Sequence, residues 1–110
     1  MIVKYKNKKI NVDVKKVSEL GKIFGLMFKN RNTKNLLFEF KKETSVKIHS
    51  FFVFFNFLAV WLDEKNEVIE SKIIKPFSLG YSPKKSFSKL VEIPINEKNG
   101  KIIAFFVGKK

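Results

Sequence analysis

Two ionisable side chains in apolar surroundings are the candidates for acid–base chemistry in this sequence. His49 begins the run His49–Asp63 (HSFFVFFNFLAVWLD), and Glu92 interrupts the apolar segment Leu90–Ile93. A histidine acts as a general base when a carboxylate or hydroxyl group lies within hydrogen-bond reach, and Glu92 and Asp63 are carboxylates that could serve. The alternatives are a histidine bonded to backbone or solvent at a strand end, and a glutamate that alternation places on the solvent face.

A loop with a different composition is a candidate anion site. Tyr81, Ser82, Lys84 and Lys85 surround Pro83 and supply two hydroxyl groups and two cations. Such groups suit a phosphate, although the same composition is also typical of a solvated turn. Together with His49 and Glu92, these four residues are the predicted binding residues, and we assign no catalytic residue.

The residue types exclude several classes of chemistry. The chain has no cysteine and one histidine, which excludes disulfides, thiol catalysis and multi-histidine metal sites. The segment Gly25-Leu26-Met27 lacks the Lys-Ser/Thr ending of a phosphate loop, so Gly25 is expected to end a helix or to allow close backbone packing. We therefore expect no metal and no cofactor. The N-terminal segment has no apolar signal region, which predicts a cytoplasmic protein.

The charge admits two interpretations. The net charge is +13, and 23 residues are Lys or Arg, of which only Arg31 is arginine. Nucleic acid or another anionic surface is one explanation. The other is composition: abundant Lys, Asn, Ile and Phe suit an AT-rich genome, and a lysine-rich chain without Gln or Cys suits a thermophile. The lysines are spread along the chain, and the arginine forks that read bases are missing.

The run His49–Asp63 must lie at the centre of the fold. Its residues are apolar in both alternating phases, which predicts strands buried on both faces. Because strands average about 5–6 residues, we expect a break near Asn56 that divides the run into two strands. The uncharged part is shorter than the roughly 20 residues of a membrane-spanning helix, so we expect no membrane association.

Turn residues arrive every 8–12 positions along the rest of the chain, as in mostly antiparallel β proteins. We predict a single α+β domain over residues 1–110: an antiparallel, barrel-like sheet of about seven or eight strands with one short helix. The helix is expected to begin at Ser18 and to end near Gly25. The strands are expected at Met1–Lys6, Lys9–Val14, Asn35–Phe40, the two halves of the central run, Glu67–Ile74, Phe87–Ile93 and Ile102–Val107, with a hairpin turn at Asn99-Gly100.

Several segments in order resemble the uncharacterised family called domain of unknown function 192. They are Gly25-Leu26-Met27-Phe28, Asn35–Phe40, His49-Ser50-Phe51-Phe52, Val60-Trp61-Leu62-Asp63, Lys75-Pro76, Tyr81–Lys85 and Leu90–Pro94. The resemblance spans about Val17 to Pro94 and implies a compact β-rich domain of the archaeal cytoplasmic kind. It implies no activity, because the family has none established.

The chain departs from that family at three places. Val53 stands where the family usually has Met, and Leu58 stands where it has a carboxylate. After Pro94 the family runs into a Gly and a short helical segment, where we expect the hairpin Ile95–Val107 instead. If the carboxylate serves chemistry, its loss at Leu58 favours a protein that binds and does not catalyse.

Three functions remain open from the sequence. The first is a monomeric, non-enzymatic binding module that contacts an anionic ligand or partner through lysines and the Tyr81–Lys85 loop. The second is a non-specific nucleic-acid binder, although no RNA-recognition, KH or helix-turn-helix motif is present. The third is an enzyme that uses His49 and Glu92.

Overall fold

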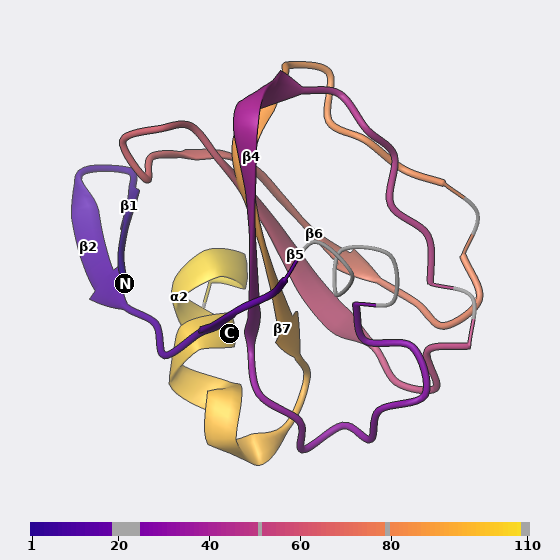
Figure 1. Cartoon of the computed structure of the whole chain (residues 1–110). Helices are drawn as coiled ribbons and strands as arrows, with labels where there is room; N and C mark the ends of the chain where they lie inside the picture. Colours follow the sequence, from indigo (N-terminus) through magenta and orange to yellow (C-terminus); the bar gives the residue numbers. More distant parts are fainter. Residues whose placement is uncertain (19–24, 51, 79, 109–110) are drawn as a thin grey trace.

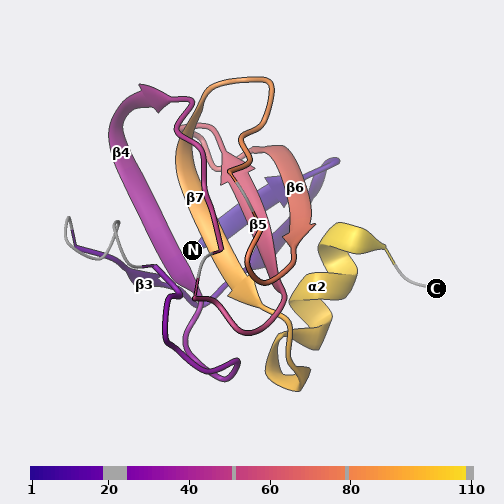
Figure 2. The ribbon, with the colours of Figure 1, turned by 90° about the vertical axis from the view of Figure 1, so that its right-hand side faces the viewer.

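A five-stranded sheet forms the centre of the molecule in the computed structural model, which describes residues 1–18, 25–50, 52–78 and 80–108. The strand order is β3-β4-β7-β5-β6, and a separate two-stranded hairpin joins β1 to β2. The hairpin and helix α2 pack against one face of the sheet, and loops cover the other (Figures 1 and 2).

The two sheets contain seven strands within the described residues. They are β1 (Ile2–Tyr5), β2 (Lys8–Asn11), β3 (Lys15–Lys16), β4 (Leu36–Thr44), β5 (Phe57–Leu62), β6 (Val68–Ile74) and β7 (Phe87–Pro94). Isolated bridges join Lys4 to Glu67 and Ile48 to Tyr81. The pairing is antiparallel except between β3 and β4. The central sheet ends at β3 and β6, which do not pair with each other among the described strands, so the expected barrel-like closure is wrong.

Strand β5 confirms that the second half of the central run is a strand buried on both faces. It pairs with β6 on one side and β7 on the other, and all six of its residues are buried. Leu58 and Val60 belong to the core beneath the hairpin and α2, whereas Phe57 and Trp61 belong to the core beneath the loops. The sheet is thus the partition between two hydrophobic cores.

The first half of the central run is not a strand, contrary to expectation. Apart from the bridge at Ile48, its described residues form turns and irregular structure. Val53 N donates a hydrogen bond to Ser50 O at 3.1 Å, and Phe52 has a φ of 59°. A positive φ is incompatible with an extended strand, so the chain turns here and enters the sheet only at Phe57.

The C-terminal segment is helical, which makes the predicted hairpin at Asn99-Gly100 and the strand Ile102–Val107 wrong. The 3₁₀ helix η1 (Glu97–Asn99) leads directly into α2 (Gly100–Val107). Asn96 caps this start, because its Oδ1 accepts a hydrogen bond from Asn99 N at 2.9 Å. Gly100 has a helical φ of −54°, whereas the expected turn needs positive values.

Helical spacing explains the outcome. Ile102, Ile103 and Phe106 recur at the intervals of one helix face and pack into the core beneath the hairpin β1–β2. The helix after Pro94 also removes one of the three stated departures from the family pattern.

The N-terminal hairpin is confirmed, with its turn at Lys6 and Asn7, whose φ values are 50° and 63°. The predicted helix that begins at Ser18 falls mostly on residues 19–24, outside the described residues. In the described part of the chain, neither helix has the length and apolar character needed to span a bilayer.

Candidate functional site

Glu92 is buried in β7, beneath the loops. It pairs with Leu36 of β4 and Ala59 of β5, and its residue is 6% exposed. No hydrogen bond or ion pair to its carboxyl group is formed by the described residues. Burial raises the pKa of Glu92 from 4.5 to about 8, because a charged carboxylate loses its hydration there. The carboxyl group is therefore mostly protonated at neutral pH, and the solvent-face interpretation is wrong.

Gly25 lies directly over this carboxyl group. A Cβ atom added at Gly25 would lie 3.4 Å from Glu92 Oε1 and 3.4 Å from Cζ of Phe38. The φ of Gly25 is +51°, a value that glycine adopts without strain. The expected close backbone packing at this residue is therefore present, and its partner is the glutamate.

Gly25 also lines a hollow of about 760 Å³. Among the described residues, the charged ones that line it are all lysines: Lys15, Lys16, Lys29 and Lys34. Ser18, Asn32 and Thr33 add hydroxyl and amide groups, and Val17, Gly25 and Leu36 complete the described lining. Lys16 Nζ lies 2.7 Å from Oε1 of Glu39, which does not itself line the hollow. We call this cavity the lysine hollow; within the described lining it contains no carboxylate.

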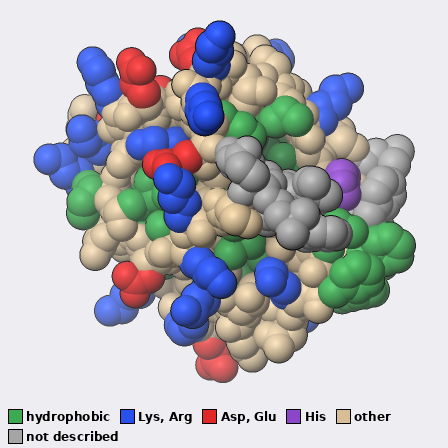
Figure 3. Space-filling view, in the orientation of Figure 1, with side chains coloured by type: hydrophobic (Ala, Val, Ile, Leu, Met, Phe, Trp, Pro, Cys, Tyr) green, Lys and Arg blue, Asp and Glu red, His purple; other side chains and the backbone are tan. Residues whose placement is uncertain are grey.

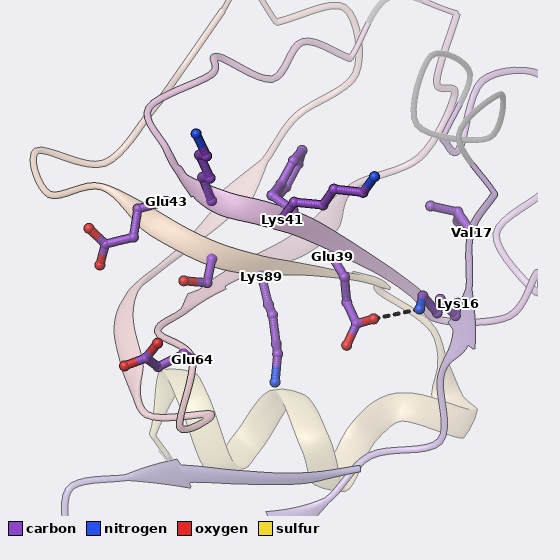
Figure 4. Close-up of a pocket in the computed structure, with 10 residues that line it drawn as sticks. Lys16, Val17, Glu39, Lys41, Glu43, Glu64 and Lys89 are labelled. Carbon is purple, nitrogen blue, oxygen red and sulfur yellow. Dashed lines mark ion pairs between the residues drawn. The ribbon is translucent and has the colours of Figure 1, made fainter.

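A second groove, of about 800 Å³, carries both signs of charge (Figure 4). Four lysines and three glutamates from β3, β4, β7 and the turn between β5 and β6 line it: Lys16, Lys41, Lys42, Lys89, Glu39, Glu43 and Glu64. Lys89 Nζ also donates to Asn66 Oδ1 at 2.6 Å. Charges of opposite sign compensate each other here, so this groove attracts an anion much less strongly than the lysine hollow does.

The predicted Tyr81–Lys85 loop crosses the outer face of the core that contains Trp61. The Tyr81 hydroxyl group donates to Oε2 of Glu70, and this hydrogen bond is the largest cause that raises the pKa of Tyr81. The Tyr81 ring lies 5.5 Å from that of Trp61, and Lys72 Nζ lies 4.6 Å from its centroid. The tyrosine hydroxyl is thus already bonded to a carboxylate.

The structure brings only some of the predicted binding residues together. His49 is exposed and follows Ile48, whose backbone exchanges two hydrogen bonds of 2.8 Å with Tyr81. Ser82 is half-buried, and Lys84 and Lys85 are exposed just before β7 begins. Glu92 lies near the other end of β7, about 17 Å along the strand from its first residue. His49 and the loop therefore neighbour each other, and Glu92 lies apart from the two loop lysines.

An exposed cluster of four phenylalanines lies outside the binding residues predicted from the sequence. Phe28, Phe52, Phe54 and Phe77 are 68%, 48%, 58% and 51% exposed. Apolar side chains gather at one edge of the molecule, near the single histidine side chain (Figure 3). The aromatic content of the central run was visible in the sequence, but it was interpreted as core.

Comparison with known proteins identifies the fold and nothing finer. No family model matches the chain, and no curated protein does. A solved protein of unknown function from Novosphingobium aromaticivorans DSM 12444 superposes with a TM-score of 0.74 at 8% identity, over 92% of this chain and 74% of that one. A "putative transcription regulator" from Sinorhizobium meliloti 1021 gives the same TM-score at 12% identity, over 92% and 81%. At such identities the likeness shows a shared fold.

Proposed function

We propose that this protein is a non-enzymatic binding module for an anionic ligand, held in the lysine hollow. The observation that carries the proposal is the lining: four lysines and no carboxylate among its described residues. Concave walls lined by charges of one sign focus the field and raise the local concentration of the opposite ion. The net charge of +13 adds to that attraction.

The size and chemistry of the hollow suit a small ligand. A volume of about 760 Å³ lies within the usual range of roughly 300–1,000 Å³ for small-molecule pockets. Hydroxyl and amide groups beside the lysines can orient oxygen atoms of a phosphate or carboxylate. The Tyr81–Lys85 loop is less well suited, because Glu70 occupies the tyrosine hydroxyl and places a negative charge beside it.

Inorganic pyrophosphate is the probe that tests this proposal. We expect it to shift the backbone amide signals of residues 29–34 at low salt. The double variant K29A/K34A should weaken binding at least about tenfold, since each lysine contributes on the order of 1 kcal/mol. The matched control is K84A/K85A, which removes the same charge from the loop and should change affinity less than about threefold.

Each other outcome overturns part of the proposal. Equal losses in both double variants would mean a diffuse charge effect and no site. A larger loss in K84A/K85A would place the ligand on the loop predicted from sequence. Absence of any shift at low salt would reject anion binding altogether.

The other functions have less support. Non-specific nucleic-acid binding remains the second candidate, motivated by charge and by the stated role of the Sinorhizobium meliloti neighbour, with which this chain shares only fold. An enzyme that uses His49 and Glu92 is the third, and the protonated carboxyl group of Glu92, which has no partner among the described residues, does not favour it. Membership of the domain of unknown function 192 family also stays a proposal, which the helix after Pro94 supports. So do a monomeric state and a cytoplasmic location.

A further inference from the structure

The exposed phenylalanines form one connected surface, which we call the aromatic patch: Phe28, Phe52, Phe54 and Phe77. The rings of Phe28 and Phe52 are stacked, with centroids 5.1 Å apart and planes at 20°. Phe77 joins Phe52 and Phe54 through edge contacts at 6.4 and 5.3 Å. Contiguous apolar surface of this kind on a small protein marks an interaction site.

Hydrogen bonds between loops fix the patch. Phe28 N donates to Phe52 O at 2.9 Å, and Phe77 N donates to Ser50 O at 2.9 Å. Ser50 itself is fully buried; its Oγ donates to Lys75 O and accepts from Ser78 N, both at 2.5 Å. Three loops far apart in sequence are thereby tied together at the residues that carry the rings.

Backbone strain shows that this exposure is imposed by the fold. Phe28, Phe52 and Phe77 have φ values of 62°, 59° and 57°. A bulky residue in the left-handed region is a genuine outlier, and such residues persist where the surrounding structure over-determines them. The backbone hydrogen bonds of Phe28 and Phe77 hold these residues in the left-handed conformation, and their rings remain exposed as a result.

The patch adjoins the lysine hollow. Gly25 and Lys29 line the hollow, and Phe28 of the same turn belongs to the patch. Lys29 N donates to Leu26 O at 3.1 Å, which closes this turn. On the loop that carries Phe77, the backbone carbonyl group of Lys75 accepts the hydrogen bond of Ser50 Oγ, and Lys75 is exposed. Exposed lysines therefore accompany the phenylalanines on both of these loops.

We propose that the aromatic patch and the lysine hollow together bind single-stranded nucleic acid, with bases stacked on the phenylalanines and phosphates among the lysines. This combination of stacking platform and cationic groove is how sequence-tolerant single-strand binders work. The inference rests on the proposed function, because it names the anion as a polynucleotide.

The composition of the patch favours this partner over others. Its large exposed side chains are all aromatic, whereas a surface that inserts into lipid usually mixes aromatic with aliphatic residues. A duplex keeps its bases stacked inside and offers no free base faces to exposed rings. The scarcity of arginine also matches binding without base readout.

The test compares two oligonucleotides with the same phosphates. One is a twelve-nucleotide oligodeoxythymidylate, and the other is an abasic strand of the same length, both titrated at about 50 mM salt. We expect the strand with bases to bind at least about tenfold more tightly. F28N and F54A should reduce that ratio toward one; asparagine tolerates the left-handed φ at position 28, so F28N removes the ring without added strain. The control is V107A, which changes an exposed apolar residue on α2 and should leave the ratio of the two affinities unchanged.

The lysine variants separate this inference from the proposed function. K29A/K34A should weaken both strands by the same factor and preserve their ratio. Equal affinities of the two strands for the wild-type protein would overturn the inference while leaving an anion-binding hollow intact. Failure of both strands and of pyrophosphate to bind would reject both proposals. Binding to vesicles of anionic lipid that depends on Phe28 and Phe54, without preference for the strand with bases, would assign the patch to a membrane surface instead.

Discussion

Oε1 of Glu92 lies 3.4 Å from the position that a Cβ atom of residue 25 would occupy, and glycine leaves that position empty. The carboxyl group is thereby enclosed by β4, β5 and the Gly25 turn, with no hydrogen-bond partner among the described residues. Burial raises the pKa of this carboxyl group from 4.5 to about 8. A protonation equilibrium within the physiological range is thus built into the sheet.

This burial predicts how stability depends on pH. The folded protein retains a proton on Glu92 up to about pH 8, whereas the unfolded chain loses it near pH 4.5. The contribution of this proton to stability is therefore complete below about pH 4.5 and is lost as the pH rises to 8. The free energy of unfolding should fall by about 1.4 kcal/mol per pH unit between those values. Urea unfolding at several pH values measures that slope.

The variant E92Q isolates the contribution of this residue. A neutral amide of the same shape cannot ionise, so the variant should show a nearly flat profile between pH 5 and 8. E97Q changes an exposed glutamate and should retain the slope of the wild-type protein. If E92Q keeps that slope, the carboxyl group is not the buried group responsible.

The backbone at Gly25 gives a second prediction. G25A should lower the free energy of unfolding by about 1–2 kcal/mol, because an L-residue with a φ of +51° pays the left-handed penalty. G100A is the matched variant: its φ is −54° and nothing lies within 4 Å of the new Cβ. That change should stabilise the protein by about 0.5–1 kcal/mol through helix propensity. Similar effects of the two substitutions in thermal unfolding would contradict the assignment of the left-handed conformation.

The sequence predicted the sheet better than the surface around it. The hydrophobic pattern is a short-range property of the sequence, and it correctly placed β4, β5, β6 and β7. It failed for Ser50–Asn56, because apolar residues in an exposed turn carry the same pattern as apolar residues in a strand. The hydrogen bonds between Ser50 and residues 75 and 78 decide between a turn and a strand, and these are long-range contacts. The aromatic patch could not be found without them.

Long-range contacts also explain the error at the C-terminus. Asn99-Gly100 is a good hairpin turn in isolation, but Asn99 has partners elsewhere. Its side chain is buried and exchanges two hydrogen bonds with Asn35, at 3.0 and 3.3 Å. It also donates to Pro94 O at 2.8 Å. A turn residue of a hairpin would face solvent, whereas the Asn99 side chain is buried and hydrogen-bonded at the start of α2.

The pair Asn35 and Asn99 gives a third prediction. N99A removes the donor to Asn35 Oδ1 and to the Pro94 carbonyl group, so it should lower stability by about 2–3 kcal/mol. A double-mutant cycle with N35A should give a coupling energy of at least about 0.5 kcal/mol, as expected for residues in one network. N30A is the control: the Asn30 side chain accepts one exposed hydrogen bond from Asn32 N, so its loss should lower stability by about 0.5 kcal/mol or less. Additive losses in the cycle would mean that the two amides do not stabilise each other.

The hydrogen bond between Tyr81 and Glu70 predicts a spectroscopic titration. The chain has two tyrosines, so Y5F leaves Tyr81 as the only phenol that ionises. Glu70 accepts a hydrogen bond from the Tyr81 hydroxyl group and repels the phenolate, and together with burial these effects hold the pKa of Tyr81 above its usual value of 10.0. In Y5F/E70Q the neutral amide removes the carboxylate, so the pKa of Tyr81 should move down toward 10. Absorbance of the phenolate against pH measures the change. K84M is the control on the same loop, and it should have little influence on the pKa of Tyr81.

An unchanged titration in Y5F/E70Q would mean that Tyr81 does not donate to Glu70 in solution. In that case the hydroxyl group would be available to an anion, and the Tyr81–Lys85 loop would compete with the lysine hollow as the binding site.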